Sequence, residues 1–277
     1  MHGNALRVSG LTTALAIILS LPTVFGLGGG VGLQAPVAPA AVEPAVAQPP
    51  PLSLLSPHPA EPARDPSAKH IEAKRRAPAL LVHVRGGLIV RASPNPDARQ
   101  IGTMPASSKY YHVPLVAWIR QVSANGRWGE VEIPYTWPQR EGWIFIAGLG
   151  RDTTRVSVEV DLSQHRVTVT QLGHRLFSTL AAIGAPSTPT PPGRYFVTDR
   201  VPFSAGSSYG LFAFGISGIQ PHLPPGWGGG DQLAIHGTND PGSIGHSVSA
   251  GCVRVPESPL ERLESLLRLG TPVVIHS

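Results

Sequence analysis

The sequence predicts a mainly β protein with one helix, built as two small β-rich domains behind a long N-terminal segment. Short runs that alternate apolar and polar residues recur from residue 80 onwards, and glycine and proline turns separate them. A hydrophobic share of 42% is enough for folded domains, whereas 31 glycines and 30 prolines among 277 residues indicate long stretches without regular structure. Only one segment, near the C-terminus, has the periodicity of an amphipathic helix.

Residues 1–40 predict an export segment. Arg7 precedes the uncharged stretch 8–42, which has an apolar centre at 11–21 and small-residue sites further on, as in a secretory signal. Pro22 interrupts the apolar stretch before it reaches the ~20 residues of a firm spanning helix. A cleaved signal peptide and a retained membrane anchor both remain open. Either predicts export to the cell envelope, with membrane contact only through this segment if it is uncleaved.

Residues 41–79 predict a disordered linker rich in proline and alanine. Ten of the 32 residues from 35 to 66 are proline, a composition that favours extended, solvated backbone over a packed core. The net charge of +5 comes from scattered lysines and arginines without a basic run, so we expect no nucleic-acid partner. A mildly basic exported protein suits a polyanionic cell wall or membrane surface.

The next segment, residues 80–150, predicts a small β-barrel. Five β-rich runs separated by turns support it, at 80–84, 88–91, 110–122, 128–133 and 142–146. Leu88–Arg91 with Pro94, Gly126–Val131 and Gly142–Ile144 resemble a bacterial Src-homology-3-like domain. We expect its tryptophans to be core or rim residues, with cell-wall binding as the alternative; they are Trp118, Trp128 and Trp143.

The C-terminal segment predicts further strands around one helix. The strands are a hairpin at 155–161 and 166–170, a run after the proline turn at 188–193, a buried strand at 232–235, a short strand at 253–255 and a last one at 271–276. Ser258, Pro259 and Glu261 predict a capping box that starts the helix, and Gly270 ends it. Its apolar stripe is Leu260, Leu263, Leu266 and Leu267.

Cys252 is the only cysteine, so no internal disulfide is possible. It lies sixteen residues after His236, which follows the buried strand 232–235 and precedes a glycine-rich turn. A thiol is a weak nucleophile until it is ionised, and a nearby imidazole can take its proton. The pair therefore predicts a cysteine nucleophile with its base, and the alternative is a buried cysteine that acts as a small hydrophobe.

Four segments in consistent order are similar to the YkuD-type L,D-transpeptidase catalytic domain. They are Thr188–Gly193, Gly210–Gly218, Gly229–Asn239 and Ser249–Arg254. The resemblance implies that residues 155–277 form a β-sandwich-like catalytic domain with one capped helix. It also implies a peptidoglycan enzyme in which Cys252 attacks the third-residue carbonyl of a tetrapeptide stem and the side-chain amine of another stem resolves the thioester. Stem peptides, and carbapenem inhibitors, are the implied partners, without a cofactor or metal.

The resemblance also implies roles for the residues around the pair. His236 shuttles the proton, and main-chain N–H groups of Gly251 and Cys252 hold the oxyanion. No carboxylate or amide has a clear claim to orient His236, so we expect the carbonyl of Gly237 to do so, with Asn239 and Asp240 as alternatives. The implied substrate-binding residues are Arg254, Ser249 and Thr238.

Ala250 departs from the family pattern, because many members have a second histidine just before the Gly-Cys. His246 is a candidate replacement for it. Hydrolysis in place of transfer would give an L,D-carboxypeptidase or a cross-link hydrolase, and loss of activity would leave a wall-binding protein. A zinc site from His236, His246 and Cys252 lacks a fourth ligand and close pairs. Papain-like peptidases place cysteine before histidine, and sortases carry a Thr-Leu-x-Thr-Cys element absent here.

Overall fold

The computed structural model describes residues 77–277, which all belong to one compact unit. The predicted export segment and nearly all of the predicted linker lie outside these residues. Within 77–277, no helix has both the length and the apolar character needed to cross a membrane.

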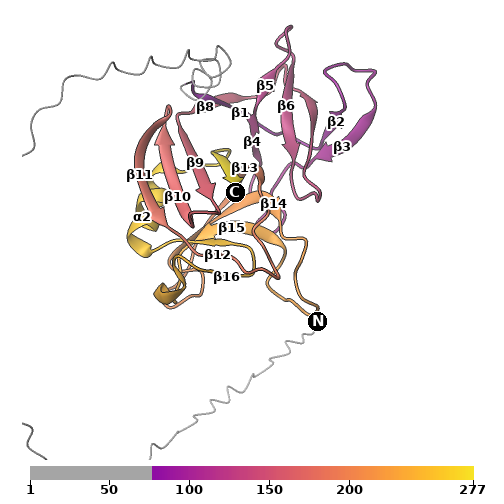
Figure 1. Cartoon of the computed structure of the whole chain (residues 1–277). Coiled ribbons are helices and arrows are strands. Elements are labelled where there is room, and N and C mark those ends of the chain that lie inside the picture. The colour runs from indigo at the N-terminus through magenta and orange to yellow at the C-terminus, as the bar shows by residue number, and fades with distance from the viewer. Residues whose placement is uncertain (1–76) are drawn as a thin grey trace, which may run out of the picture. The chain divides into compact units, whose positions relative to one another are not determined.

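The N-terminal region, residues 79–154, consists of two small sheets around one core. Its strands are β1 (Ala79–His83), β2 (Leu88–Arg91), β3 (Gln100–Met104), β4 (Val116–Ile119), β5 (Gln121–Val122), β6 (Trp128–Ile133), β7 (Arg140–Phe145) and β8 (Arg151–Thr154). One sheet has the order β4-β1-β8 and the other β3-β2-β7-β6-β5 (Figure 1). Because β8 pairs with β1, these strands continue beyond the predicted boundary at residue 150. The resemblance to an SH3-like domain stays a prediction.

The expected strand over 110–122 is wrong in its first half. Residues 109–111 form a turn, His112 has a positive φ of 54°, and regular pairing begins only at Val116. Pro114, which has no N–H to donate, marks the point at which the chain returns towards extended structure. Residues 107–113 therefore form a loop, although the pattern over 110–122 resembles that of a single strand.

The C-terminal region, residues 156–276, is built on a single eight-stranded sheet. Its strands are β9 (Val156–Asp161), β10 (Arg166–Gln171), β11 (His174–Leu180), β13 (Gly193–Pro202), β14 (Phe212–Ile219), β15 (Gln232–His236), β17 (Val253–Arg254) and β18 (Pro272–His276). The order is β11-β10-β9-β18-β13-β14-β15-β17, with β12 (Ile183–Gly184) and β16 (Ser247–Ser249) paired beside it (Figure 1). A mainly β fold with one α-helix in the described chain confirms the predicted class.

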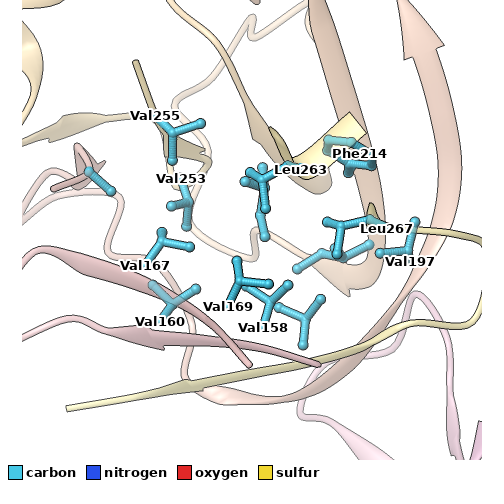
Figure 2. Close-up of a cluster of buried hydrophobic side chains, with 14 of the residues drawn as sticks. Val158, Val160, Val167, Val169, Val197, Phe214, Val253, Val255, Leu263 and Leu267 are labelled. Carbon is cyan, nitrogen blue, oxygen red and sulfur yellow. The ribbon is translucent and has the colours of Figure 1, made fainter. Parts of the chain in front are cut away.

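The core of this region lies between the sheet and the helix α2 (Glu257–Leu266). Along β9 every second residue is buried, so Val158 and Val160 point inwards while their neighbours face outwards. Figure 2 shows these valines beside Leu263 and Leu267, with Val253 and Val255 in the same cluster. Burial of each such side chain stabilises the fold by about 1.5–3 kcal/mol. Val253, which directly follows Cys252 and begins β17, is thus fixed in the core.

The helix confirms the predicted apolar stripe but not the predicted cap. It begins at Glu257, with Pro256 as the N-cap and no side-chain cap hydrogen bond, so the capping box at Ser258 is wrong. Glu257 is held from outside the helix, because its Oε1 accepts a hydrogen bond of 3.1 Å from the N–H of Leu211. A proline is tolerated at position 259 because first-turn N–H groups have no partner inside the helix. The helix ends at Leu266, before Gly270.

A buried polar network joins the two regions. Glu132 on β6 is 3% exposed and accepts hydrogen bonds from Ser217 on β14 and, at 2.9 Å, from Gln139. The hydroxyl of Ser217 also accepts a hydrogen bond of 3.0 Å from the N–H of Phe196. The side chain of Gln139 donates one of 2.8 Å to the carbonyl of Arg194. Burial raises the pKa of Glu132 to about 8, although these hydrogen bonds oppose the shift. The carboxyl group is therefore protonated near neutral pH.

Glu132→Gln is expected to flatten the pH dependence of stability. A carboxyl whose pKa rises from 4.5 to about 8 on folding binds a proton more tightly in the folded state, so stability is lost as pH rises through that window. Relative to the neutral glutamine, the wild type should lose roughly 3 kcal/mol between pH 4.5 and pH 7. Denaturant unfolding from pH 4 to 9 measures this. The matched change at exposed Glu261 should leave the slope unaltered, and equal slopes for wild type and Glu132→Gln would contradict the assignment.

Candidate active site

Two parallel strands place the predicted residues on one face of the sheet. β15 pairs with β17 so that Ile235 lies beside Val253 and His236 beside Arg254. Ile235 and Val253 point into the core, with 0% and 1% exposure. Because side chains alternate along a strand, His236 and Arg254 face the opposite side, together with Cys252 at the end of β17. The structure thus brings Cys252, His236 and Arg254 together.

His236 is oriented by the main chain, as the sequence predicted. Its Nδ1 lies 2.6 Å from the carbonyl oxygen of Gly237, so Nδ1 carries the proton that is donated to this carbonyl. The ring is 4% exposed, and burial lowers the pKa of His236 to about 4, helped by the Arg254 charge and opposed by the Gly237 hydrogen bond. The imidazole is therefore neutral near pH 7, and its Nε2 lone pair can accept a proton.

Cys252 is half-buried, on the face of the sheet that also carries this imidazole. Burial raises the pKa of the thiol, while a hydrogen bond from the backbone of Ala234 and the charge of Arg254 oppose the shift. A raised thiol pKa and a lowered imidazole pKa both favour the neutral pair over a thiolate–imidazolium pair at rest. The arrangement suits proton transfer that accompanies attack on a substrate.

Tyr209 packs against His236, a contact that the sequence analysis did not predict. Its ring centroid lies 4.8 Å from that of His236 at an angle of 57°, and Phe203 stacks on its other side at 4.9 Å. Burial and the charge of Cys252 raise the pKa of the Tyr209 hydroxyl. Tyr209 lies in a polar loop whose pattern indicates only a turn, so no local signal links it to the histidine.

The turn before Cys252 is held by Ser249. Ser249 is 2% exposed, and its hydroxyl donates a hydrogen bond of 2.6 Å to the carbonyl of Cys252 and accepts one of 3.0 Å from the N–H of Gly251. Ser249 thus positions the main chain next to the thiol, and its contact with substrate stays a prediction. The Gly251 N–H already has this partner, and the oxyanion role of the Cys252 N–H likewise stays a prediction.

Thr238 likewise holds the main chain. Its hydroxyl accepts a hydrogen bond of 3.0 Å from the N–H of Asp240 and donates one of 3.3 Å to the carbonyl of the same residue. The residue is 9% exposed. Thr238 thus closes the turn after His236, ahead of the short helix η1 (Pro241–Ser243), and its contact with substrate stays a prediction.

Three further polar residues fix the turn from the opposite side. The hydroxyl of Thr188 donates a hydrogen bond of 2.9 Å to the carbonyl of Ser249, and that of Thr190 donates one of 2.8 Å to the carbonyl of Gly251. Gln220 donates to the carbonyls of Thr188 and Pro189 at 3.0 and 2.9 Å. The segment 188–193 carried the family resemblance, and its hydroxyls explain why: they hold the main chain that presents the thiol.

Gly251→Ala is expected to disrupt this turn. Gly251 has φ of +116°, and an added Cβ would lie 2.2 Å from Nε2 of Gln220. Both the strained backbone and the collision must be relieved by moving the thiol or Gln220, so we expect a loss of about 1–3 kcal/mol in stability and slower acylation of Cys252. Thermal unfolding and intact-mass acylation rates measure the two effects. Gly87→Ala is the control, because its Cβ meets Thr103 at an ordinary 3.6 Å.

Arg254 presents an unused hydrogen-bond donor. Within the described chain its Nε is buried and has no hydrogen-bond partner. Its charge lowers the pKa of both His236 and Cys252, which places it beside both groups. His246, the candidate second histidine, is exposed. Over residues 77–277, no three histidine, cysteine, aspartate or glutamate side chains gather closely enough to hold a metal ion.

Comparison with known proteins identifies the family of the C-terminal region. The L,D-transpeptidase catalytic domain family, YkuD, matches residues 155–275. The YkuD protein of Bacillus subtilis, provisionally named an L,D-transpeptidase, is 30% identical over 135 residues, which cover 48% of this chain and 74% of that protein. The chain belongs to the YkuD family of L,D-transpeptidase catalytic domains.

Solved structures of L,D-transpeptidases also resemble this chain. The avibactam carbamoyl enzyme called Ldtfm is 23% identical, with a TM-score of 0.35, and the match covers 44% of this chain and 49% of that one. An L,D-transpeptidase in complex with imipenem is 16% identical, with a TM-score of 0.38, and the match covers 58% of this chain and 89% of that one. The chain thus spans about half the length of the first of these structures.

Proposed function

We propose that this protein is a peptidoglycan L,D-transpeptidase whose nucleophile is Cys252. The observation that carries the proposal is the placement of the lone thiol and a neutral, oriented imidazole on one face of adjacent strands, in a chain of this family. A thiol with a base beside it is the minimum requirement for forming a thioester. We further propose that the enzyme acts after export, on the cell wall, which the export-like N-terminal sequence supports.

In the first half-reaction, Sγ of Cys252 attacks the carbonyl carbon of the third stem residue. Nε2 of His236 takes the thiol proton as the carbon–sulfur bond forms, and the N–H of Cys252 stabilises the negative oxygen. The carbon–nitrogen bond to the terminal D-amino acid then breaks, and His236 returns the proton to the leaving amine. The product is a thioester on Cys252 and one free D-amino acid.

In the second half-reaction, the side-chain amine of a second stem attacks the thioester. His236 takes a proton from the amine and returns it to the sulfur, so the thiol is regenerated and a 3-3 cross-link forms. The positive charge of Arg254, close enough to lower the pKa of both His236 and Cys252, is suited to a carboxylate of the stem. Water in place of the amine would give a tripeptide, the product of an L,D-carboxypeptidase.

Incubation of the purified chain with a tetrapeptide stem, followed by mass spectrometry, tests the proposal. Cross-linked dimer with release of the terminal D-amino acid is the expected result. Tripeptide without dimer would replace transfer by hydrolysis, and unchanged substrate would support a non-catalytic wall-binding protein. A carbapenem should also add to Cys252 by the same attack, and intact mass reads the adduct.

A further inference from the structure

A groove opens from the face that carries Cys252 and His236, and the N-terminal region forms one of its walls. The cavity measures about 360 Å³, within the range of small-ligand sites. Its lining includes Ala234, which hydrogen-bonds Cys252, and Tyr209, which contacts His236. Tyr110 and Tyr111, from the loop 107–113, also line it. The groove is therefore incomplete without the N-terminal region.

The loop is fixed to the C-terminal region through Asp231. Nζ of Lys109 lies 2.7 and 2.8 Å from its two carboxylate oxygens, and the Tyr110 hydroxyl donates 2.7 Å to Oδ1. The N–H of Asp231 donates 3.1 Å back to the same hydroxyl. Partial burial of Asp231 would raise the pKa of its carboxyl group, but the hydrogen bonds from Lys109 and Tyr110 outweigh burial and lower this pKa. The contact is therefore ionic at neutral pH.

Hydrogen bonds also link Asp231 to the turn before Cys252. The carbonyl of Asp231 accepts 2.7 Å from the N–H of Gln220, whose side chain supports the turn before Cys252. Gly230 allows the close approach, because a Cβ there would lie 3.0 Å from the ring of Tyr110. Tyr110 thus serves as an anchor, whereas Tyr111 is 51% exposed and free to meet a ligand.

The lining of the groove is aromatic and uncharged. Its side chains include no aspartate, glutamate, lysine, arginine or histidine, and the polar side chains among them are those of the three tyrosines and Gln232. Stem peptides carry carboxylates and amines, which an uncharged groove would not satisfy. An N-acetylated sugar ring instead offers an apolar C–H face to an aromatic ring and hydroxyls to amphipathic side chains.

We propose that this groove binds the saccharide of the peptidoglycan donor strand, with the exposed ring of Tyr111 as the platform. The inference rests on the proposed function for the nature of the donor. It makes the N-terminal region part of the substrate site, because its loop supplies the platform. The stem then enters the face of Cys252 while the sugar to which it is linked occupies the groove.

Kinetics with two donors test the proposal on the full chain. The wild type should have a lower KM for a disaccharide-tetrapeptide than for the free tetrapeptide. Tyr111→Ala should raise the KM for the disaccharide-tetrapeptide by about tenfold and leave kcat and the KM for the free tetrapeptide unchanged, while Tyr111→Phe keeps the wild-type preference. Phe145→Ala, which removes an exposed aromatic of the same region outside the groove, is the matched control. Equal KM values for the two donors in the wild type, or an equal rise for both in Tyr111→Ala, would overturn the proposal.

Calorimetric titration with an uncharged N-acetylated disaccharide that lacks the stem separates this inference from the proposed function. Binding by the wild type that Tyr111→Ala weakens supports the saccharide site even if no cross-link forms from tetrapeptide. Turnover of tetrapeptide together with undetectable disaccharide binding at millimolar concentration would reject the saccharide site and leave the proposed function standing.

Discussion

Cys252→Ala is expected to abolish both cross-link formation and carbapenem adduct formation. The chain has no second thiol, and every covalent step of the proposed reaction passes through this sulfur. The expected loss in turnover is at least about 10⁴-fold, in line with removal of a nucleophile that works as a unit with its base. Steady-state assay on tetrapeptide and intact-mass analysis after carbapenem treatment provide two independent measurements.

Cys252→Ser sharpens this test, because it keeps the size of the side chain. A hydroxyl is much harder to deprotonate than a thiol, so a neutral imidazole with a pKa of about 4 is too weak a base to activate it. We expect the free energy of unfolding of this variant to match that of the wild type. Such a match would mean that the turn at 249–252 is intact. A carbapenem adduct that persists in Cys252→Ser would refute attack by this residue.

The second large effect is expected at His236. Loss of the base in His236→Ala should slow acylation at pH 7 by about 10²–10⁴-fold. The pH profile gives a more specific result. Because burial lowers the pKa of His236 to about 4, the imidazole is a competent base above that pH and becomes protonated below it. The wild-type acylation rate should therefore fall on the acid side with a midpoint near pH 4.

In His236→Ala this acid limb should disappear. Its residual acylation should instead rise with pH, since the thiol must then ionise on its own and burial raises its pKa. Stopped-flow or quenched acylation by a carbapenem from pH 3 to 9 measures both profiles. His246→Ala is the matched control at an exposed histidine and should follow the wild type. An acid midpoint near 6.5 or above in the wild type would contradict a buried, neutral base.

The sequence alone located the strands that carry the reacting groups, and the physical reason is local. An apolar run at 232–235 followed by glycines specifies a buried strand and a turn, which puts His236 at a strand end. The carbonyl of Gly237 could be proposed because it is the adjacent residue. The hairpin of β9 and β10 follows from strict alternation.

What the sequence could not supply depends on long-range contacts or on side-chain direction. Tyr209 and Gln220 reach the site from loops far from His236 and Cys252 in the chain, and neither has a local pattern of its own. The hydrogen bond from Ser249 to the main chain could not be foreseen, because the sequence does not show the direction in which a hydroxyl near a nucleophile points. The cap of α2 was misplaced because Glu257 is held by Leu211, a tertiary contact.

The position of β18 bears on how the molecule folds. This strand lies between β9 and β13, pairing parallel with one and antiparallel with the other. Its partner in β9 is distant along the chain, because Val273 pairs with Val158. The two halves of the eight-stranded sheet therefore join only through a contact between distant segments, and such non-local pairing makes folding slow.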